Sequence, residues 1–415
     1  MTGKPPPLDL DRLIDDRRTR IIVCCGSGGV GKTTIAAAIG LRAAERGRHV
    51  VVLTVDPARR LAQSMGLTSL DNTPRPVRGI KTEDHPAGNE AESAGSLHAM
   101  MLDMKRTFDE IVEAHADPDR AAQILANPFY LSLSSSFAGT QEYMAMEKLG
   151  QLRRADEWDL IVVDTPPSRS ALDFLDAPQR LARFLDGRLL RLLIAPAKVG
   201  GRAYLRALNV GFGMVTGVLT KILGTQVLRD VQTFVSALDT MFGGFRERAD
   251  YTYQLLRAPG TAFLVVAAPE DDALREASYF VERLDTERMP LAGLVLNRVQ
   301  RVPAVHLSAA RSLAAVEALA GAAGNTASGH GAAADEGAAH DGSGEHGEHG
   351  TARQLTIAAL QLHADRMTQA ASERRMASGF AAAHPLVPMA QIPAQPEDVH
   401  DLEGLRRIGE SFAAD

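Results

Sequence analysis

The sequence predicts an α/β fold with a parallel sheet. Ile21–Cys25 is an apolar run of strand length that ends at a cluster of glycines. A helical pattern follows from Lys32 to about Arg46, and a second apolar run covers Val50–Val55. Strand, glycine turn, helix and strand make one βαβ unit, whose crossover is right-handed and whose two strands are parallel.

Three later apolar runs predict further strands, at Leu160–Val163, Phe263–Ala267 and Leu291–Leu296. The stretches between them, residues 97–151 and 177–256, are mostly helical in pattern and too long for ordinary connections. We therefore expect a helical subdomain inserted into the α/β core.

We expect a single domain that comprises residues 20–320 and 351–415, with a lead before it and a tether within it. Residues 1–19 lack the apolar run of a signal peptide and are expected to form a flexible lead. Residues 321–350 hold no large apolar side chain and are rich in glycine, alanine and histidine, so we expect a disordered tether. Its histidines, at 330, 340, 346 and 349, are too irregularly spaced to predict a metal site.

Composition excludes several classes of protein. A net charge of −6 argues against a general nucleic-acid binder, which needs a basic face for phosphates. The two cysteines, Cys24 and Cys25, are neighbours, which excludes a cysteine-type zinc site and suits a reducing cytoplasm. The apolar stretch 189–223 is no membrane span, because Arg206 and Lys221 leave only about fourteen uncharged residues of the ~20 required.

Residues 26–33, Gly-Ser-Gly-Gly-Val-Gly-Lys-Thr, match the phosphate-binding loop G-x-x-x-x-G-K-[ST]. In such a loop backbone N–H groups surround the phosphates, the lysine reaches the β- and γ-phosphates, and the hydroxyl after it ligates Mg²⁺. The pattern therefore predicts binding of ATP and Mg²⁺ by Gly28, Gly29, Val30, Gly31, Lys32, Thr33 and Thr34.

The same glycines also fit the dinucleotide pattern G-x-G-x-x-G, with Asp56 at the end of the next strand as the ribose-binding acid. Two features favour the phosphate loop. A dinucleotide fold has no use for Lys32 and Thr33 directly after the last glycine. In addition, Asp164 ends a later strand, where a magnesium-side aspartate belongs.

Hydrolysis of ATP needs an oriented water and neutralised phosphate charge. We assign Asp56 to positioning the attacking water, and Lys32 together with Mg²⁺ to neutralising the phosphate charge. Asp164 is assigned to holding the water molecules that surround the metal ion. The alternative for Asp56 is a helix cap after the strand, since Asp-Pro often starts a turn.

With these motifs the chain resembles the family of the arsenite-pump ATPase (ArsA type) and the tail-anchored-protein targeting ATPase, from Ile21 to the C-terminus. Residues 27–34 resemble that family's phosphate loop, 56–58 its first switch and 164–167 its second. The resemblance implies that Asn297 reads adenine and that Pro393, with 398–402, covers the base. It also implies a P-loop ATPase fold and a dimer.

The sequence departs from the family at several positions. Ser27 stands where the family has a signature lysine that crosses a dimer interface to the partner's phosphates. In a dimer of the family's type, two serine hydroxyls would face the nucleotides, which predicts slow hydrolysis. Arginines 59, 60 and 169 are candidates for the missing cation, although each alone suits a solvated surface. The family's metal-binding cysteines and second fused half are absent, which argues against an arsenite pump.

These features lead to one expectation and one alternative. We expect a cytoplasmic, Mg²⁺-dependent ATPase whose nucleotide state gates a helical subdomain that binds a client or partner protein. The alternative is a nucleotide-binding regulatory subunit that hydrolyses little ATP and joins a related ATPase in a hetero-oligomer. An apolar stripe within 189–223 suits a client groove and an ordinary core equally well.

Overall fold

The computed structural model describes residues 5–55, 59–81, 95–127, 130–131, 140–165, 247–248, 250–327 and 345–413. Three sets of predicted features lie outside these residues: Asp56 with the rest of the first switch, residues 166–170 of the second switch, and the apolar stretch 189–223.

An eight-stranded sheet forms the centre of the fold, in the order β3-β4-β2-β5-β1-β6-β7-β8. All neighbouring strands are parallel except β3 and β4, which are antiparallel. The strands are β1 (Ile21–Cys25), β2 (His49–Thr54), β3 (Arg75–Pro76), β4 (Ser96–Met101), β5 (Leu160–Asp164), β6 (Thr261–Ala267), β7 (Leu291–Val299) and β8 (Met389–Pro393). The α/β fold class and the five strands expected from the sequence are thus confirmed.

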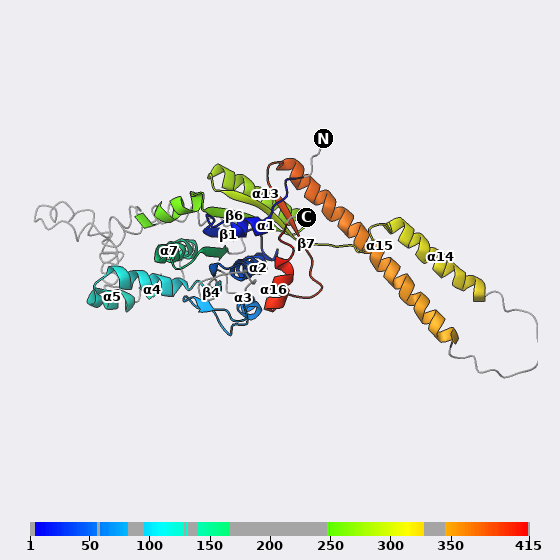
Figure 1. The fold of residues 1–415 in the computed structure, drawn as a ribbon, viewed down its shortest axis with the longest axis horizontal. Coiled ribbons are helices and arrows are strands. Elements are labelled where there is room, and N and C mark those ends of the chain that lie inside the picture. The colour runs from blue at the N-terminus through cyan, green and yellow to red at the C-terminus, as the bar shows by residue number, and fades with distance from the viewer. Residues whose placement is uncertain are drawn as a thin grey trace, which may run out of the picture.

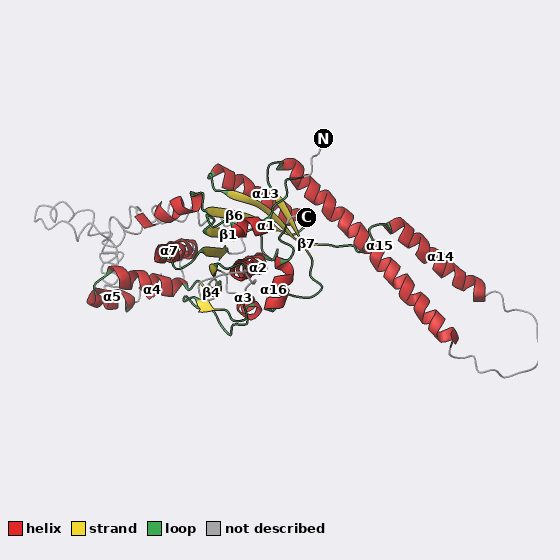
Figure 2. Ribbon diagram, viewed as in Figure 1, coloured by secondary structure: helices red, strands yellow, loops and turns green. Residues whose placement is uncertain are grey.

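Helices cover the sheet and extend from it on two sides (Figures 1 and 2). They are α1 (Leu10–Asp15), α2 (Lys32–Glu45), α3 (Arg59–Ser64), α4 (Met104–His115), α5 (Pro118–Leu125), α7 (Thr140–Ala155), α13 (Asp271–Thr286), α14 (Ala309–Ala327), α15 (Glu345–Ala383) and α16 (Leu402–Gly409). Within the part of the chain that is described, none of them has the length and apolarity that a membrane span needs.

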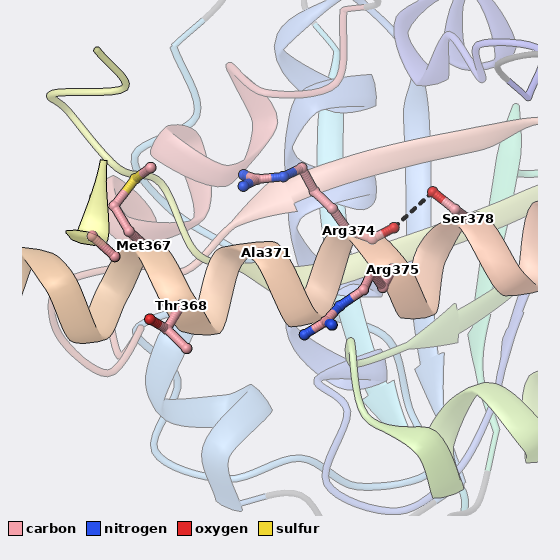
Figure 3. Close-up of a pocket in the computed structure, with 7 residues that line it drawn as sticks. Met367, Thr368, Ala371, Arg374, Arg375 and Ser378 are labelled. Atoms are coloured by element: carbon pink, nitrogen blue, oxygen red, sulfur yellow. Dashed lines mark hydrogen bonds between the residues drawn. The ribbon is translucent and has the colours of Figure 1, made fainter. Parts of the chain in front are cut away.

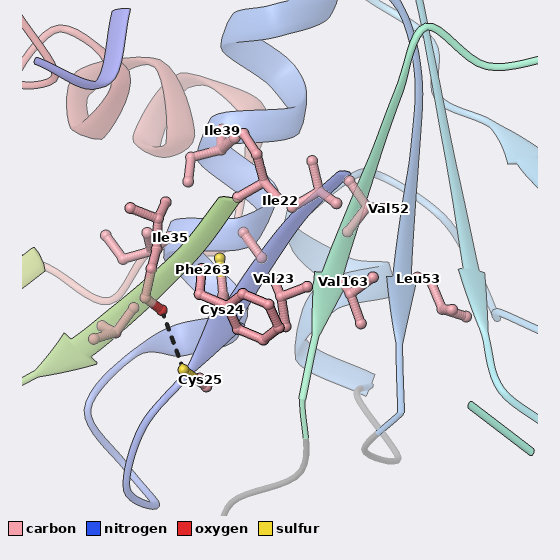
Figure 4. Close-up of a cluster of buried hydrophobic side chains, with 14 of the residues drawn as sticks. Ile22, Val23, Cys24, Cys25, Ile35, Ile39, Val52, Leu53, Val163 and Phe263 are labelled. Atoms are coloured by element: carbon pink, nitrogen blue, oxygen red, sulfur yellow. Dashed lines mark hydrogen bonds between the residues drawn. The ribbon is translucent and has the colours of Figure 1, made fainter. Parts of the chain in front are cut away.

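The core lies around β1, which is buried along its whole length between β5 and β6. Figure 4 shows side chains of β1, such as Val23, beside Phe263 of β6 and Val163 of β5. Strands buried on both faces consist of nearly continuous apolar residues, which explains why these runs could be recognised in the sequence.

The expectation of a flexible lead is wrong for residues 5–19. Pro7 pairs with Met389 at the β8 edge of the sheet, and Leu10 is fully buried at the start of α1. Arg48, which is 1% exposed, donates hydrogen bonds to the backbone oxygens of Ile14 (2.7 Å) and Thr19 (2.6 Å). Its burial lowers its pKa to about 10. The lead is short of apolar residues, but this buried guanidinium fastens it to the domain.

Two further boundaries need correction. The segment that we expected to begin a helical subdomain at residue 97 begins instead as strand β4, which pairs with β2. The expected tether, 321–350, is helical at both ends, because α14 continues to Ala327 and α15 begins at Glu345. Alanine has the highest helix propensity, so an alanine-rich segment can be helical without large apolar side chains. Residues 328–344 lie outside the described part.

Candidate functional site

The phosphate loop connects the end of β1 to α2, and both neighbours of β1 end at the same edge of the sheet. In parallel α/β sheets the carboxyl ends of the strands form the ligand-binding edge. The loop contains three glycines in the left-handed region, Gly26 (φ +150°), Gly29 (φ +80°) and Gly31 (φ +92°). A Cβ at Gly26 would lie 2.1 Å from the backbone oxygen of Val266, so the loop needs glycine at that position.

The loop leaves the N-terminus of α2 open to an anion. Gly31 is the N-cap of this 14-residue helix, and no side chain caps it. A Cβ at Gly29 would meet nothing within 4 Å, which shows open space above the loop. Uncapped N–H groups and the helix dipole favour a bound phosphate at this end.

The carboxylate of Asp164 accepts hydrogen bonds from hydroxyl groups of two other segments. Oδ2 of Asp164 accepts hydrogen bonds from Thr33 Oγ1 at 2.6 Å and from Thr54 Oγ1 at 3.0 Å. Asp164 ends β5 and is 1% exposed, Thr33 lies in the first turn of α2, and Thr54 ends β2. A carboxylate beside a hydroxyl, next to a phosphate loop, is the oxygen-rich donor set that Mg²⁺ prefers.

The contact with Thr54 was not foreseen from the sequence. Thr54 stands two residues before Asp56, and the backbone N–H of Val55 donates to the backbone oxygen of Asp164 at 3.1 Å. The end of β2, two residues before Asp56, is therefore hydrogen-bonded to the proposed magnesium-side aspartate. A threonine that ends a strand just before a proposed catalytic aspartate was the only signal for this contact.

Lys32 is 5% exposed, and its ammonium donates to the backbone oxygen of Ser27 at 2.8 Å. This bond draws the lysine back over its own loop. Within the described residues, the Ser27 hydroxyl is buried and has no hydrogen-bond partner. Ser27 as a whole is half-buried, and its place toward a partner subunit stays a prediction.

Asn297 contacts the phosphate loop directly. It is 6% exposed near the end of β7, and its Nδ2 donates to the backbone oxygen of Val30 at 2.8 Å. A Cβ at Gly31 would lie 2.4 Å from the same nitrogen, so asparagine and loop are closely packed. Pro393 ends β8 on the same edge, where it pairs with Val299 two residues beyond Asn297.

The cysteines beside the site belong to the core. Cys24 and Cys25 are fully buried, and burial raises the pKa of both thiols, that of Cys25 to about 12. The carboxylate of Asp164 raises the pKa of Cys24 further. Both thiols stay protonated near neutral pH and offer neither a nucleophile nor a metal ligand.

A cavity of about 670 Å³ lies along α15 (Figure 3). Ala309 and one face of α15 from Met367 to Ser378 line it, and Arg374 and Arg375 point in opposite directions beside it. It contains none of the residues predicted to bind nucleotide, so we place the candidate site at the phosphate loop.

Comparison with known proteins agrees with this geometry. Residues 19–309 match the model of a family described as anion-transporting ATPases. A protein named ATPase GET3 from Malassezia globosa is 27% identical over 43% of this chain and 48% of its own length. ATPase get3 from Schizosaccharomyces pombe is 23% identical over 72% of this chain and 79% of its own length. A relative from Halobacterium salinarum matches over only 28% of its length, so the chain spans about half or less of some curated relatives.

Proposed function

The chain belongs to the family of anion-transporting ATPases, and from this premise we propose that it hydrolyses ATP with Mg²⁺ at the phosphate loop. The observation that supports this most is that the hydroxyl groups of Thr33 and Thr54 both donate hydrogen bonds to the same carboxylate oxygen of Asp164. Three separate segments contribute to these bonds, which lie directly beneath the open N-terminus of α2.

In the proposed site, the N–H groups from Gly28 to Thr34 bind the phosphates, and Lys32 exchanges the Ser27 oxygen for a phosphate oxygen. Thr33 and Asp164 hold the magnesium ion, which neutralises phosphate charge when it is bound. Asn297 and Pro393 lie on the side of β7 and β8, where they would receive the adenine.

Asp56 is proposed to orient the attacking water. One residue, Val55, separates it from the end of β2, and the last residue of β2, Thr54, contacts Asp164. A movement of the magnesium-side aspartate is therefore passed to the backbone that carries Asp56. Such a link would make the water position depend on the state of the phosphates.

The helical region is proposed to follow the nucleotide state through buried polar contacts. Asn72, which follows α3, donates to Glu110 of α4 at 3.0 Å and accepts from Thr107 at 3.1 Å. Glu110 in turn pairs with Lys148 of α7 at 3.0 Å. Because α7 leads into β5, this network joins the segments after Asp56 to the segment before Asp164.

A second set of ion pairs, centred on a buried glutamate, connects α7 with the segment before β6. Glu147 of α7 is 3% exposed and pairs with Arg248 at 3.1 Å and with Arg154 at 3.3 Å. Arg248 precedes the helical residues 250–257, which lead into β6. We propose that these contacts transmit closure at the phosphates to a surface that binds a hydrophobic client or a partner protein.

The resemblance to the ArsA-type family supports two further proposals, a dimeric assembly and a place in the cytoplasm. The serine at position 27, where the family has a lysine, favours a second candidate function, a nucleotide-binding subunit with little turnover that acts with a related ATPase. No cation at Ser27 reaches a neighbouring nucleotide, so intrinsic hydrolysis is expected to be slow.

Steady-state phosphate release from the purified chain separates the two candidates. We expect Mg²⁺-dependent turnover that falls at least ~100-fold in Asp56→Asn while ATP binding survives, because only the transition state is affected. Asp117→Asn, at the exposed N-cap of α5 (Pro118–Leu125), is the matched control. If the wild type binds ATP but releases phosphate no faster than Asp56→Asn, the regulatory subunit is favoured instead.

Gating of the helical region is tested by hydrogen exchange with ADP and with a non-hydrolysable ATP analogue. We expect nucleotide-dependent protection in α4 and α7 that disappears in Glu110→Gln, which weakens the ion pair with Lys148 and keeps the shape. Glu113→Gln, one turn away on α4, is the control. Equal protection in Glu110→Gln and the wild type would contradict this route.

A further inference from the structure

Helix α15 carries one charged side chain on its buried face. Ala370, Glu373, Ala377 and Phe380 follow one another on this face at steps of three or four residues, and each is at most 8% exposed. Glu373 itself is 5% exposed. A buried carboxylate is costly unless hydrogen-bond donors surround it, so the donors that Glu373 meets show what its burial secures.

Both carboxylate oxygens of Glu373 accept a hydrogen bond. Oε1 accepts from Nε2 of Gln369, one turn earlier on α15, at 3.0 Å. Oε2 accepts from the backbone N–H of Gln300 at 2.8 Å, and Gln300 is the residue directly after β7. Hydrogen bonds to an ionised acceptor are stronger than those between neutral groups. Glu373 therefore fixes the chain just beyond the end of β7.

The residue that Glu373 fixes follows a bulge in β7. The pairing of β7 with β8 shifts between Leu296 and Val299, so that three steps along β7 (296 to 299) match two along β8 (391 to 393). A bulge adds one residue to a strand and re-aims a side chain, and bulges are common beside functional sites. One side chain inside this bulge is Asn297, whose Nδ2 donates to the backbone oxygen of Val30 in the phosphate loop.

The bulge holds Arg298 in a conformation that arginine does not favour. Its φ is +62°, in the left-handed region, and its side chain is exposed. A residue other than glycine keeps such a backbone only where its surroundings fix it. Before Arg298, the chain is fixed by Asn297 on the loop. After it, the Val299 oxygen accepts from the N–H of Ala394 at 2.9 Å, and the next N–H donates to Glu373.

We propose that Glu373 is a positioning residue for the nucleotide: by fixing the chain beyond the bulge, it holds Asn297 against the phosphate loop. The proposal rests on the nucleotide site proposed above and adds α15 to the elements that build it. Without the carboxylate, the bulge is free to relax into a regular strand. A slip of one residue turns a side chain to the opposite face of a sheet, which would take Asn297 away from the loop.

Hydrogen exchange of the chain without nucleotide tests whether Glu373 fixes the bulge. Glu373→Met removes the acceptor and keeps a long unbranched side chain, so we expect the N–H of Ala394 to exchange at least about tenfold faster. Glu373→Gln keeps an oxygen for Gln300, because the amide of Gln369 can turn to accept from the new NH₂ group, and should stay within about twofold of the wild type.

Phe380→Leu is the control for loss of packing, because it changes the same buried face of α15 without touching Gln300. It is expected to lower the melting temperature and to leave the exchange of Ala394 unchanged. Equal exchange in Glu373→Met and the wild type, or equal acceleration in Phe380→Leu, overturns the proposal.

Calorimetry with magnesium ATP and magnesium pyrophosphate tests the effect on the nucleotide. We expect Glu373→Met to bind both ligands at least about fivefold more weakly. Since Glu373 acts through Asn297, the double variant with Asn297→Ala should lose less affinity than the product of the two single losses. A full product, or wild-type affinity in Glu373→Met, overturns the role of Glu373. A wild type that binds neither ligand refutes the nucleotide site itself, an outcome distinguishable because every variant shares it.

Two substitutions at Arg298 separate the backbone of the bulge from the charge of the guanidinium. Valine disfavours the left-handed region, whereas glycine adopts it freely. We therefore expect Arg298→Val to weaken ATP binding as Glu373→Met does, and Arg298→Gly to stay within about twofold of the wild type. Weaker binding in Arg298→Gly than in Arg298→Val would show that the guanidinium acts directly, and would overturn the action of Glu373 through the bulge.

Discussion

Asn297 is expected to support the phosphate loop as well as the adenine, and Asn297→Ala separates the two roles. The substitution removes the Nδ2 donor that reaches the Val30 oxygen at 2.8 Å inside a buried contact. Loss of a buried hydrogen bond costs about 1–3 kcal/mol, because its partner is left unsatisfied. If the loop must recover that contact when phosphate binds, affinity falls about 5- to 150-fold.

The assay compares two ligands by isothermal titration calorimetry, magnesium pyrophosphate and magnesium ATP. Pyrophosphate has no base, so a residue that only reads adenine leaves its affinity unchanged. We expect Asn297→Ala to lose affinity for both, with a larger loss for ATP. Gln391→Ala, which is exposed on β8 opposite Leu296, is the control. Unchanged pyrophosphate affinity in Asn297→Ala would refute the supporting role.

Four other substitutions have defined outcomes. Lys32→Ala removes a charge-assisted contact and should cost about 2–4 kcal/mol of ATP binding or transition-state energy, measured with a fluorescent analogue and by turnover. Ser27→Lys should raise turnover or tighten the ATP-bound dimer, measured by phosphate release and sedimentation; no response in either would show a different nucleotide interface. Arg48→Met leaves buried carbonyls without a donor and should lower the free energy of unfolding by at least ~3 kcal/mol in urea titrations. Gly26→Ala forces a Cβ onto the Val266 oxygen and should lower the melting temperature and abolish ATP binding, whereas a normal protein would show that the loop adapts.

Recognition of the strands from sequence depended on burial. The sheet is covered on both faces, so β1, β2, β5, β6 and β7 each contain a continuous apolar run. The strands β4 and β8 are only partly buried and contain polar residues, and β3 has two residues. Short or half-buried strands have no such run, and pairing alone determines them.

By itself the sequence determined the phosphate loop, the α/β class and the family, because glycine, lysine and threonine at fixed spacing have a meaning that does not depend on distant residues. Only the tertiary structure decided that Thr54 meets Asp164, that Asn297 holds the loop, and that Arg48 fastens the lead. It also decided which face of α15 remains exposed. Each of these contacts joins residues far apart in the chain, and their proximity follows from the order of the strands and the packing of helices.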